Sequence, residues 1–127
     1  MKAGEERDRF LVDEMLQHLA VVALTIKEGR DRLNASPQTR YALEHATELL
    51  AETGEKTSRR FKIANTGIPW EDLRKFRHDV AHPYDLGATR IETAQLWKFA
   101  QDDAPRIARY LRRAKFPKDA DSAVRRN

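Results

Sequence analysis

The chain has 127 residues, of which 40% are apolar and 35% charged, and it carries a net charge of +4. Its length fits one domain, and the absence of cysteine excludes disulfides and thiolate chemistry. No apolar run approaches the roughly 20 residues that cross a bilayer, and the charged N-terminus does not resemble a signal peptide. We therefore expect a soluble, cytoplasmic protein with no membrane partner and a mild preference for polyanions.

The first half of the chain carries the spacing of two long helices. Residues 1–7 are polar and are expected to fray. Residues 8–28 place apolar side chains on one helical face and stop before a glycine. Residues 30–35 are polar and predict a connection. Ser36 and Pro37 form a helix start signal, with serine as N-cap and proline in the first turn. They predict a second helix that ends near residue 53, before Gly54.

The second half predicts two further main helices. Residues 56–64 indicate a short helix or an irregular segment. A third main helix begins near Trp70 and ends before Pro83, because proline lacks a backbone N–H and disfavours helical geometry in the preceding residue. The last helix runs from Thr89 to about residue 111. Pro105 lies inside it and predicts a kink, or a restart capped by a preceding aspartate, which is either Asp102 or Asp103.

The helical periods and the lack of strand-like alternation predict an all-α fold. Short connections favour an antiparallel bundle of four main helices with a kinked last helix. Residues 1–114 would form this domain. Residues 115–127 lack periodicity and carry four cations, so we predict a basic, mobile tail there.

The stretch from Trp70 to Tyr84 holds the most chemistry. Arg77 is followed directly by His78, then by His82 at the predicted helix end and by Tyr84. On their own these residues also fit an ordinary helix end. Arg77 would then be solvated, His82 favoured by the helix dipole, and Tyr84 an apolar anchor in the following loop.

The pattern of arginine, four residues, histidine, one residue and tyrosine, preceded by Ile68-Pro69-Trp70, resembles the HepT-like branch of the HEPN superfamily. The likeness covers roughly residues 8–114 and includes Arg40–Glu44 in the second helix and the kinked last helix. His78 departs from the asparagine that commonly follows the motif arginine in that family. The resemblance implies a HEPN-like bundle at whose third main helix the motif ends.

The resemblance also implies an activity, namely metal-independent cleavage of RNA without any cofactor. The RNA 2′-hydroxyl attacks the adjacent phosphorus and leaves a cyclic phosphate. His82 suits proton transfer because imidazole titrates near neutral pH, and Arg77 suits the charge that builds on the phosphorane. His78 would support them, and Arg74 and Lys75 would contact RNA. Family members pair two motifs across a homodimer cleft, which implies the same here.

A separate role is implied for Tyr84. In HepT-like proteins a minimal nucleotidyltransferase antitoxin, MntA, adenylylates the motif tyrosine and silences the toxin, so an MntA-like partner is expected. One alternative keeps the bundle as a non-catalytic partner or substrate-presenting subunit of such a nucleotidyltransferase. A helical DNA-binding regulator is a weaker third class, because no basic recognition helix is apparent.

Three further features have ordinary explanations beside functional ones. His78 and His82 are spaced as in a zinc-protease helix, but Asp79 replaces the longer glutamate base and no third ligand stands out. We therefore predict no metal. Basic residues could line an RNA groove or an ordinary solvated face; they are Arg59, Arg60, Lys62, Arg74, Lys75, Arg106, Arg109, Arg112 and Arg113. Trp70 and Trp97 suit packing anchors better than base-stacking platforms.

Overall fold

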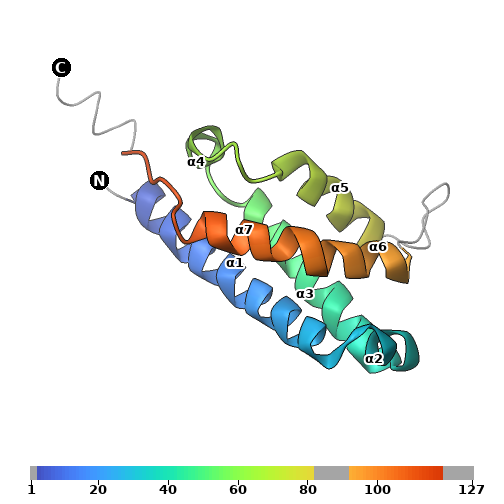
Figure 1. The fold of residues 1–127 in the computed structure, drawn as a ribbon. Helices are drawn as coiled ribbons and strands as arrows, with labels where there is room; N and C mark the ends of the chain where they lie inside the picture. The colour runs from blue at the N-terminus through green and yellow to red at the C-terminus, as the bar shows by residue number, and fades with distance from the viewer. Residues whose placement is uncertain (1–2, 82–91, 119–127) are drawn as a thin grey trace, which may run out of the picture.

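Helices form nearly all of the part of the chain that the structure describes, residues 3–81 and 92–118 of a computed structural model. No strand occurs within these residues, which confirms the all-α prediction. The elements are α1 (Ala3–Glu28), α2 (Arg30–Ala35), α3 (Pro37–Glu55), α4 (Arg59–Ala64), α5 (Trp70–Ala81), α6 (Thr93–Lys98), the π-helical segment η1 (Phe99–Asp103) and α7 (Ala104–Leu111) (Figure 1). The four main helices are α1, α3, α5 and the run from α6 through α7.

Several boundaries follow from local chemistry that the sequence displays. Ser36 caps α3, since its Oγ accepts a hydrogen bond from the Thr39 N–H at 3.2 Å, and Pro37 is the first helical residue. Gly29 has φ 92°, a conformation that favours glycine, and it separates α1 from α2. Helix α5 begins at Trp70, as predicted, and is described as far as Ala81. Its predicted end before Pro83 lies outside the described residues.

Four local predictions were wrong. The last helix begins at Thr93, with Glu92 as its N-cap, and not at Thr89. Residues 3–7 are helical rather than frayed, and residues 30–35 form the short helix α2 because Leu33 can bury its side chain there. Helix α3 also continues through Gly54 to Glu55. A Cβ at Gly54 would lie 3.2 Å from Met15 Cε and 3.4 Å from Trp70 Cζ3. This glycine therefore lets α1 and α5 approach α3 closely instead of ending the helix.

The core lies between α1, α3 and the last helix, and α5 covers the other flank of α3 (Figure 1). Side chains from all four main helices form one buried cluster, which also includes Phe61 of α4 and Ile68. Phe76 of α5 stacks against Phe99 of η1, with ring centroids 4.7 Å apart. Burial of this apolar surface is the main stabilising term of the fold, and it fixes α5 against both neighbours.

The last helix deviates from α geometry immediately before Pro105. Residues 99–103 are π-helical, and the Ala104 N–H donates to the Phe99 carbonyl. The wider turn accommodates a proline, which cannot donate to the preceding turn. The predicted interruption is thus confirmed as a π segment. Asp103 precedes α7 but makes no side-chain capping bond.

The start of α1 and the residues that follow α7 both attach to α4. The Asp8 carboxylate accepts from Ser58 N–H at 2.8 Å and from Ser58 Oγ at 2.6 Å. Buried Asn65 bonds both backbone groups of Lys115 at 2.8 Å each, and Phe116 packs on Phe61. The first residues of the predicted tail are therefore anchored. Its mobility stays a prediction for residues 119–127, which lie outside the described residues.

None of the helices in residues 3–81 and 92–118 has both the length and the apolar character that crossing a bilayer requires.

Candidate functional site

Arg77 lies on α5 and faces the end of α3. Its Nη1 is 3.6 Å from Glu55 Oε2, and the two side chains are 35% and 38% exposed. The Arg77 Nε, in contrast, is buried and has no hydrogen-bond partner among the described residues. The guanidinium is therefore partly buried, in a loose ion pair, with part of the side chain accessible to solvent.

The direction of the two helices explains this pair. Because α5 follows α3 with only a short α4 between them, Trp70 at the start of α5 packs beside Gly54 near the end of α3. Side chains on a helix lean toward its N-terminus. The long side chain of Arg77 can thus reach back toward Glu55, the last residue of α3.

The two predicted RNA-binding residues also lie on α5. Arg74 bonds Glu71 through Nη2 at 2.5 Å and Nε at 3.4 Å. The hydrogen bond and charge of Glu71 raise the pKa of Arg74, and Glu55 adds to this effect. The same pairing lowers the pKa of Glu71. Arg74 and Lys75 are both exposed, so both can meet a polyanion.

A cavity of about 430 Å³ opens between α3, α4 and α5, on the side of α5 that carries Arg74. Charged side chains and an apolar floor line it: Ala51, Gly54, Glu55, Lys62, Trp70, Glu71, Leu73 and Arg74. Lys62 is held by the carbonyls of Glu55 at 2.9 Å and Thr57 at 2.8 Å. Burial lowers the pKa of Lys62, against the opposing charges of Glu55 and Asp8.

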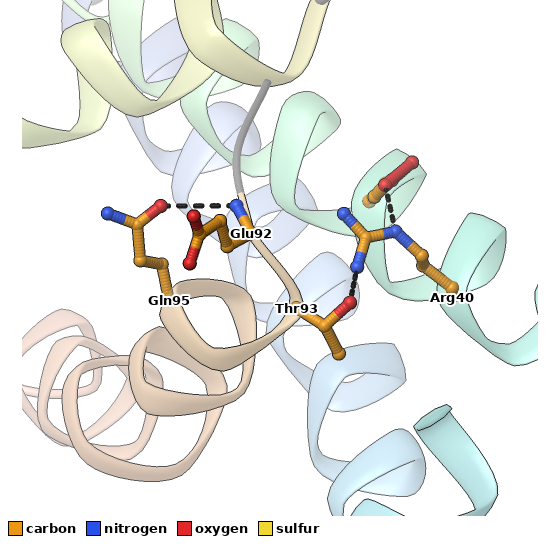
Figure 2. Close-up of polar contacts among 5 residues, drawn as sticks. Arg40, Glu92, Thr93 and Gln95 are labelled. Atoms are coloured by element: carbon orange, nitrogen blue, oxygen red, sulfur yellow. Dashed lines mark hydrogen bonds and ion pairs between the residues drawn. The ribbon is translucent and has the colours of Figure 1, made fainter. Parts of the chain in front are cut away.

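Polar contacts hold the start of α6 (Thr93–Lys98) in place. Gln95 Oε1 accepts from the Glu92 N–H at 3.1 Å at the start of α6. Arg40 of α3 bonds Thr93 Oγ1 and also pairs with Glu44 at 2.7 Å (Figure 2). These contacts join α6 to α3, so the start of α6 is placed relative to Arg77 through α3.

The structure tests only part of the predicted site. Arg77, Arg74 and Lys75 share α5, as expected. The backbone of His78 belongs to the same helix, but its side chain lies outside the described residues, as do His82 and Tyr84. The placement of His82 beside Arg77, which the implied activity requires, therefore stays a prediction. Among the described residues, no group of three or more metal-ligating side chains gathers, which leaves the zinc question at His78 and His82 untested.

The remaining predicted features are distributed over the surface and core. The basic residues lie on α4, on α5 and at the end of the last helix. Several of them border different cavities, with Lys62 and Arg74 at one, Arg106 at another, and Arg109 and Arg112 at a third. Trp70 and Trp97 pack against the core, and Trp70 Nε1 donates to the Asn65 carbonyl at 3.0 Å, so they are packing anchors as predicted.

The sequence did not single out Glu55, because its pairing with Arg77 depends on how α3 and α5 pack.

Arg40 and Glu44 were also missed as a pair that holds α6. Their spacing of four residues favours a helical ion pair, and this signal is visible in the sequence. Their third partner, Thr93, is 53 positions from Arg40 and comes only from the tertiary fold.

The chain is similar in sequence to known proteins of the ribonuclease class. A family model described as "Ribonuclease HepT-like" matches residues 2–114. The chain is 27% identical over 70 residues to the "Probable ribonuclease HepT" of Thermococcus cleftensis, a match that covers 55% of this chain and 60% of that protein. It is 26% identical over 98 residues to the "Putative RNase MJ1380" of Methanocaldococcus jannaschii, which covers 77% of this chain and 86% of that protein.

No solved structure matches the chain. The family match, however, spans the whole bundle, from α1 through α7, and includes the helix that carries Arg77. The chain therefore belongs to the HepT-like ribonuclease family.

Proposed function

We propose that this chain is a metal-independent endoribonuclease and the toxin of a toxin–antitoxin pair of the HepT/MntA type. Family membership supports the ribonuclease class. The observation that carries the residue assignment is the guanidinium of Arg77, which is partly exposed and only loosely paired. An accessible arginine of this kind can bind a phosphodiester through two parallel hydrogen bonds.

The proposed reaction is an internal transfer of the phosphodiester. His82 takes the proton of the RNA 2′-hydroxyl, whose oxygen then forms a bond to the adjacent phosphorus. The bond from phosphorus to the 5′-oxygen breaks, and that oxygen takes a proton from an imidazolium. The products are a 2′,3′-cyclic phosphate and a 5′-hydroxyl. Arg77 stabilises the charge on the phosphorane, with His78 in support and with Arg74 and Lys75 along the RNA backbone.

A homodimer would provide two copies of Arg77 and His82 at one cleft, so that one histidine acts as base and the other as acid. Light scattering on the purified protein should then give twice the chain mass of 14.7 kDa. Because RNA is the substrate, the proposal places the protein in the cytoplasm.

Cleavage of a defined single-stranded RNA tests the assignment. Arg77→Ala and His82→Ala should each lower the cleavage rate by about a hundredfold or more, since each removes a group required in the transition state. Arg30→Ala on α2 is the matched control for the loss of one exposed positive charge and should cleave normally. Full activity in the Arg77 and His82 variants would refute the assignment. A wild-type protein that cuts no RNA would favour the non-catalytic partner.

Regulation by the partner is proposed to act at Tyr84. Transfer of AMP to its hydroxyl would put phosphate charge beside the RNA site and repel the substrate. Intact-mass measurement after co-expression with an MntA-like nucleotidyltransferase should show one AMP-sized increment, and Tyr84→Phe should remove it. An increment that persists in Tyr84→Phe would contradict this role.

A further inference from the structure

Glu55 lies among three cations at the junction of α3, α4 and α5. It pairs with Arg77 at 3.6 Å, and its charge acts on both Arg74 and Lys62. Its backbone carbonyl also accepts a hydrogen bond from Lys62 Nζ at 2.9 Å. One carboxylate therefore partly balances three positive side chains that come from two different helices.

Two of these cations, Lys62 and Arg74, line an open space. The cavity of about 430 Å³ is also lined by Glu55 and by Glu71, the close partner of Arg74. Arg77 is not part of this lining, but it reaches the carboxylate of Glu55 from the next turn of α5. The cavity has room for more than the Glu55 side chain. A phosphodiester carries one negative charge on two oxygens, as a carboxylate does, and suits the same cationic surroundings.

The pair between Arg77 and Glu55 has the geometry of a contact that can be exchanged. Its N–O separation of 3.6 Å is longer than a charge-assisted hydrogen bond. Both side chains are more than one-third exposed, so solvent screens their attraction. In addition, the buried Arg77 Nε has no hydrogen-bond partner among the described residues. An incoming anion would therefore not have to displace an acceptor from it.

We propose that this cavity is a phosphodiester subsite for the RNA backbone, and that Glu55 is its resident anion in the RNA-free protein. Binding of RNA moves the Glu55 carboxylate aside and transfers Arg77 to a phosphate. Lys62 and Arg74 then neutralise the same phosphate through charge. The inference rests on the proposed function, because it assumes that Arg77 meets RNA.

The subsite makes Glu55 a competitor of RNA rather than a catalytic residue. Glu55→Gln keeps the size of the side chain and removes its charge. It should tighten binding of RNA by about two- to fivefold, the range expected for the loss of an exposed ion pair. KM should fall by the same factor, while kcat stays within about twofold of wild type.

The chain offers a closely matched control. Glu52 lies one turn earlier on α3, is also 38% exposed and pairs with Lys56 at 3.6 Å. Glu52→Gln removes the same charge but does not touch Arg77. It should leave affinity and KM unchanged. An equal gain in both variants would mean that only overall charge matters, and it would overturn the subsite.

Binding is measured first with a 2′-O-methyl oligoribonucleotide, which has the RNA backbone but cannot be cleaved. Fluorescence anisotropy gives the affinity of wild type, Glu55→Gln, Glu52→Gln and Arg77→Gln, and of the variant with both Glu55→Gln and Arg77→Gln. The gain from Glu55→Gln should be clearly smaller when Arg77 is also replaced, because the Arg77 guanidinium is no longer there to be released and only Lys62 and Arg74 still benefit. A gain of equal size in the Arg77→Gln background would overturn the exchange.

The two proposals fail in different ways. If wild type cleaves RNA, Arg77→Ala does not, and Glu55→Gln binds and cleaves as wild type, then the subsite is wrong and the ribonuclease stands. If Arg77→Ala cleaves as wild type, the catalytic assignment is wrong, while the binding series still decides on Glu55. A kcat that falls tenfold or more in Glu55→Gln would make Glu55 a positioning residue and would also contradict the resident-anion role.

Discussion

Single side chains in this protein differ sharply in how tightly their surroundings hold them. Arg77 is fixed at its stem by the packing of α5 on α3, yet its charge is met only by a partly exposed carboxylate. Asn65, in contrast, is fully buried and uses both ends of its amide to bind Phe61 and Lys115. Loose pairing leaves the Arg77 guanidinium able to change partners, as the proposed function requires.

His18 supplies a pH test at the residue scale. Burial lowers its pKa below 6.5, the nearby charge of Glu14 opposes this, and His45 lowers the pKa further. The unfolded chain therefore takes up a proton first as the pH falls. The contribution of His18 to the free energy of unfolding should be fully present above pH 6.5. It should be lost as the pH falls from 6.5 to the lower pKa of His18 in the folded protein.

Chemical denaturation between about pH 8 and pH 5 measures this effect. His18→Gln should show a smaller loss of stability than wild type across that range. An identical pH dependence in both proteins would assign the loss to other groups.

At the scale of elements, hydrogen bonds to Asp8, near the N-terminus, hold the short helix α4 in place. The buried Asp8 carboxylate accepts two hydrogen bonds from Ser58, the N-cap of α4. Asp8→Ala should lower the free energy of unfolding by about 1.5–3 kcal/mol, the range for hydrogen bonds to a charged group. Urea denaturation checks this, with exposed Asp13→Ala on the same helix as the control. Equal effects of the two variants would show that the hydrogen bonds from Ser58 to Asp8 do not hold α4 in place.

The turn between α4 and α5 depends on a glycine for space. A Cβ at Gly67 would lie 2.1 Å from Tyr110 Cε2, so the ring of the last helix would have to move. Gly67→Ala should cost about 1–3 kcal/mol of stability, as overpacking does. Adding Tyr110→Ala should make the combined loss smaller than the sum of the two single losses. Strict additivity, measured by thermal unfolding, would show that the two residues do not meet.

The elements also show where sequence reasoning succeeds and where it stops. Ser36 and Pro37 act within a few residues, through a side-chain cap and a fixed backbone angle, so they predicted the start of α3 correctly. The predictions for Gly54 and for residues 30–35 were wrong because tertiary packing overrides local preference. Gly54 packs against Met15 and Trp70, and Leu33 is buried. The motif placed Arg77 on α5, but its partner Glu55 depends on the antiparallel approach of α3 and α5, which no spacing within one helix encodes.

At the scale of the whole molecule, the bundle fixes the position of α5, the helix that carries Arg77. Helix α5 packs on α3 along one side and on η1 through Phe76 and Phe99. Arg40 ties the start of α6 to the same α3. The chain between Ala81 and Glu92 carries His82 and Tyr84 and thus begins and ends on elements joined through α3.

The products of RNA cleavage test the central claim most directly. Mass spectrometry of a defined RNA, incubated with the purified protein in the presence of a metal chelator, should show a 2′,3′-cyclic phosphate on one fragment and a 5′-hydroxyl on the other. The same incubation with Arg77→Ala should leave the RNA intact. A 5′-phosphate at the cut, or cleavage that stops when the chelator is added, would contradict attack by the 2′-hydroxyl at a metal-free site.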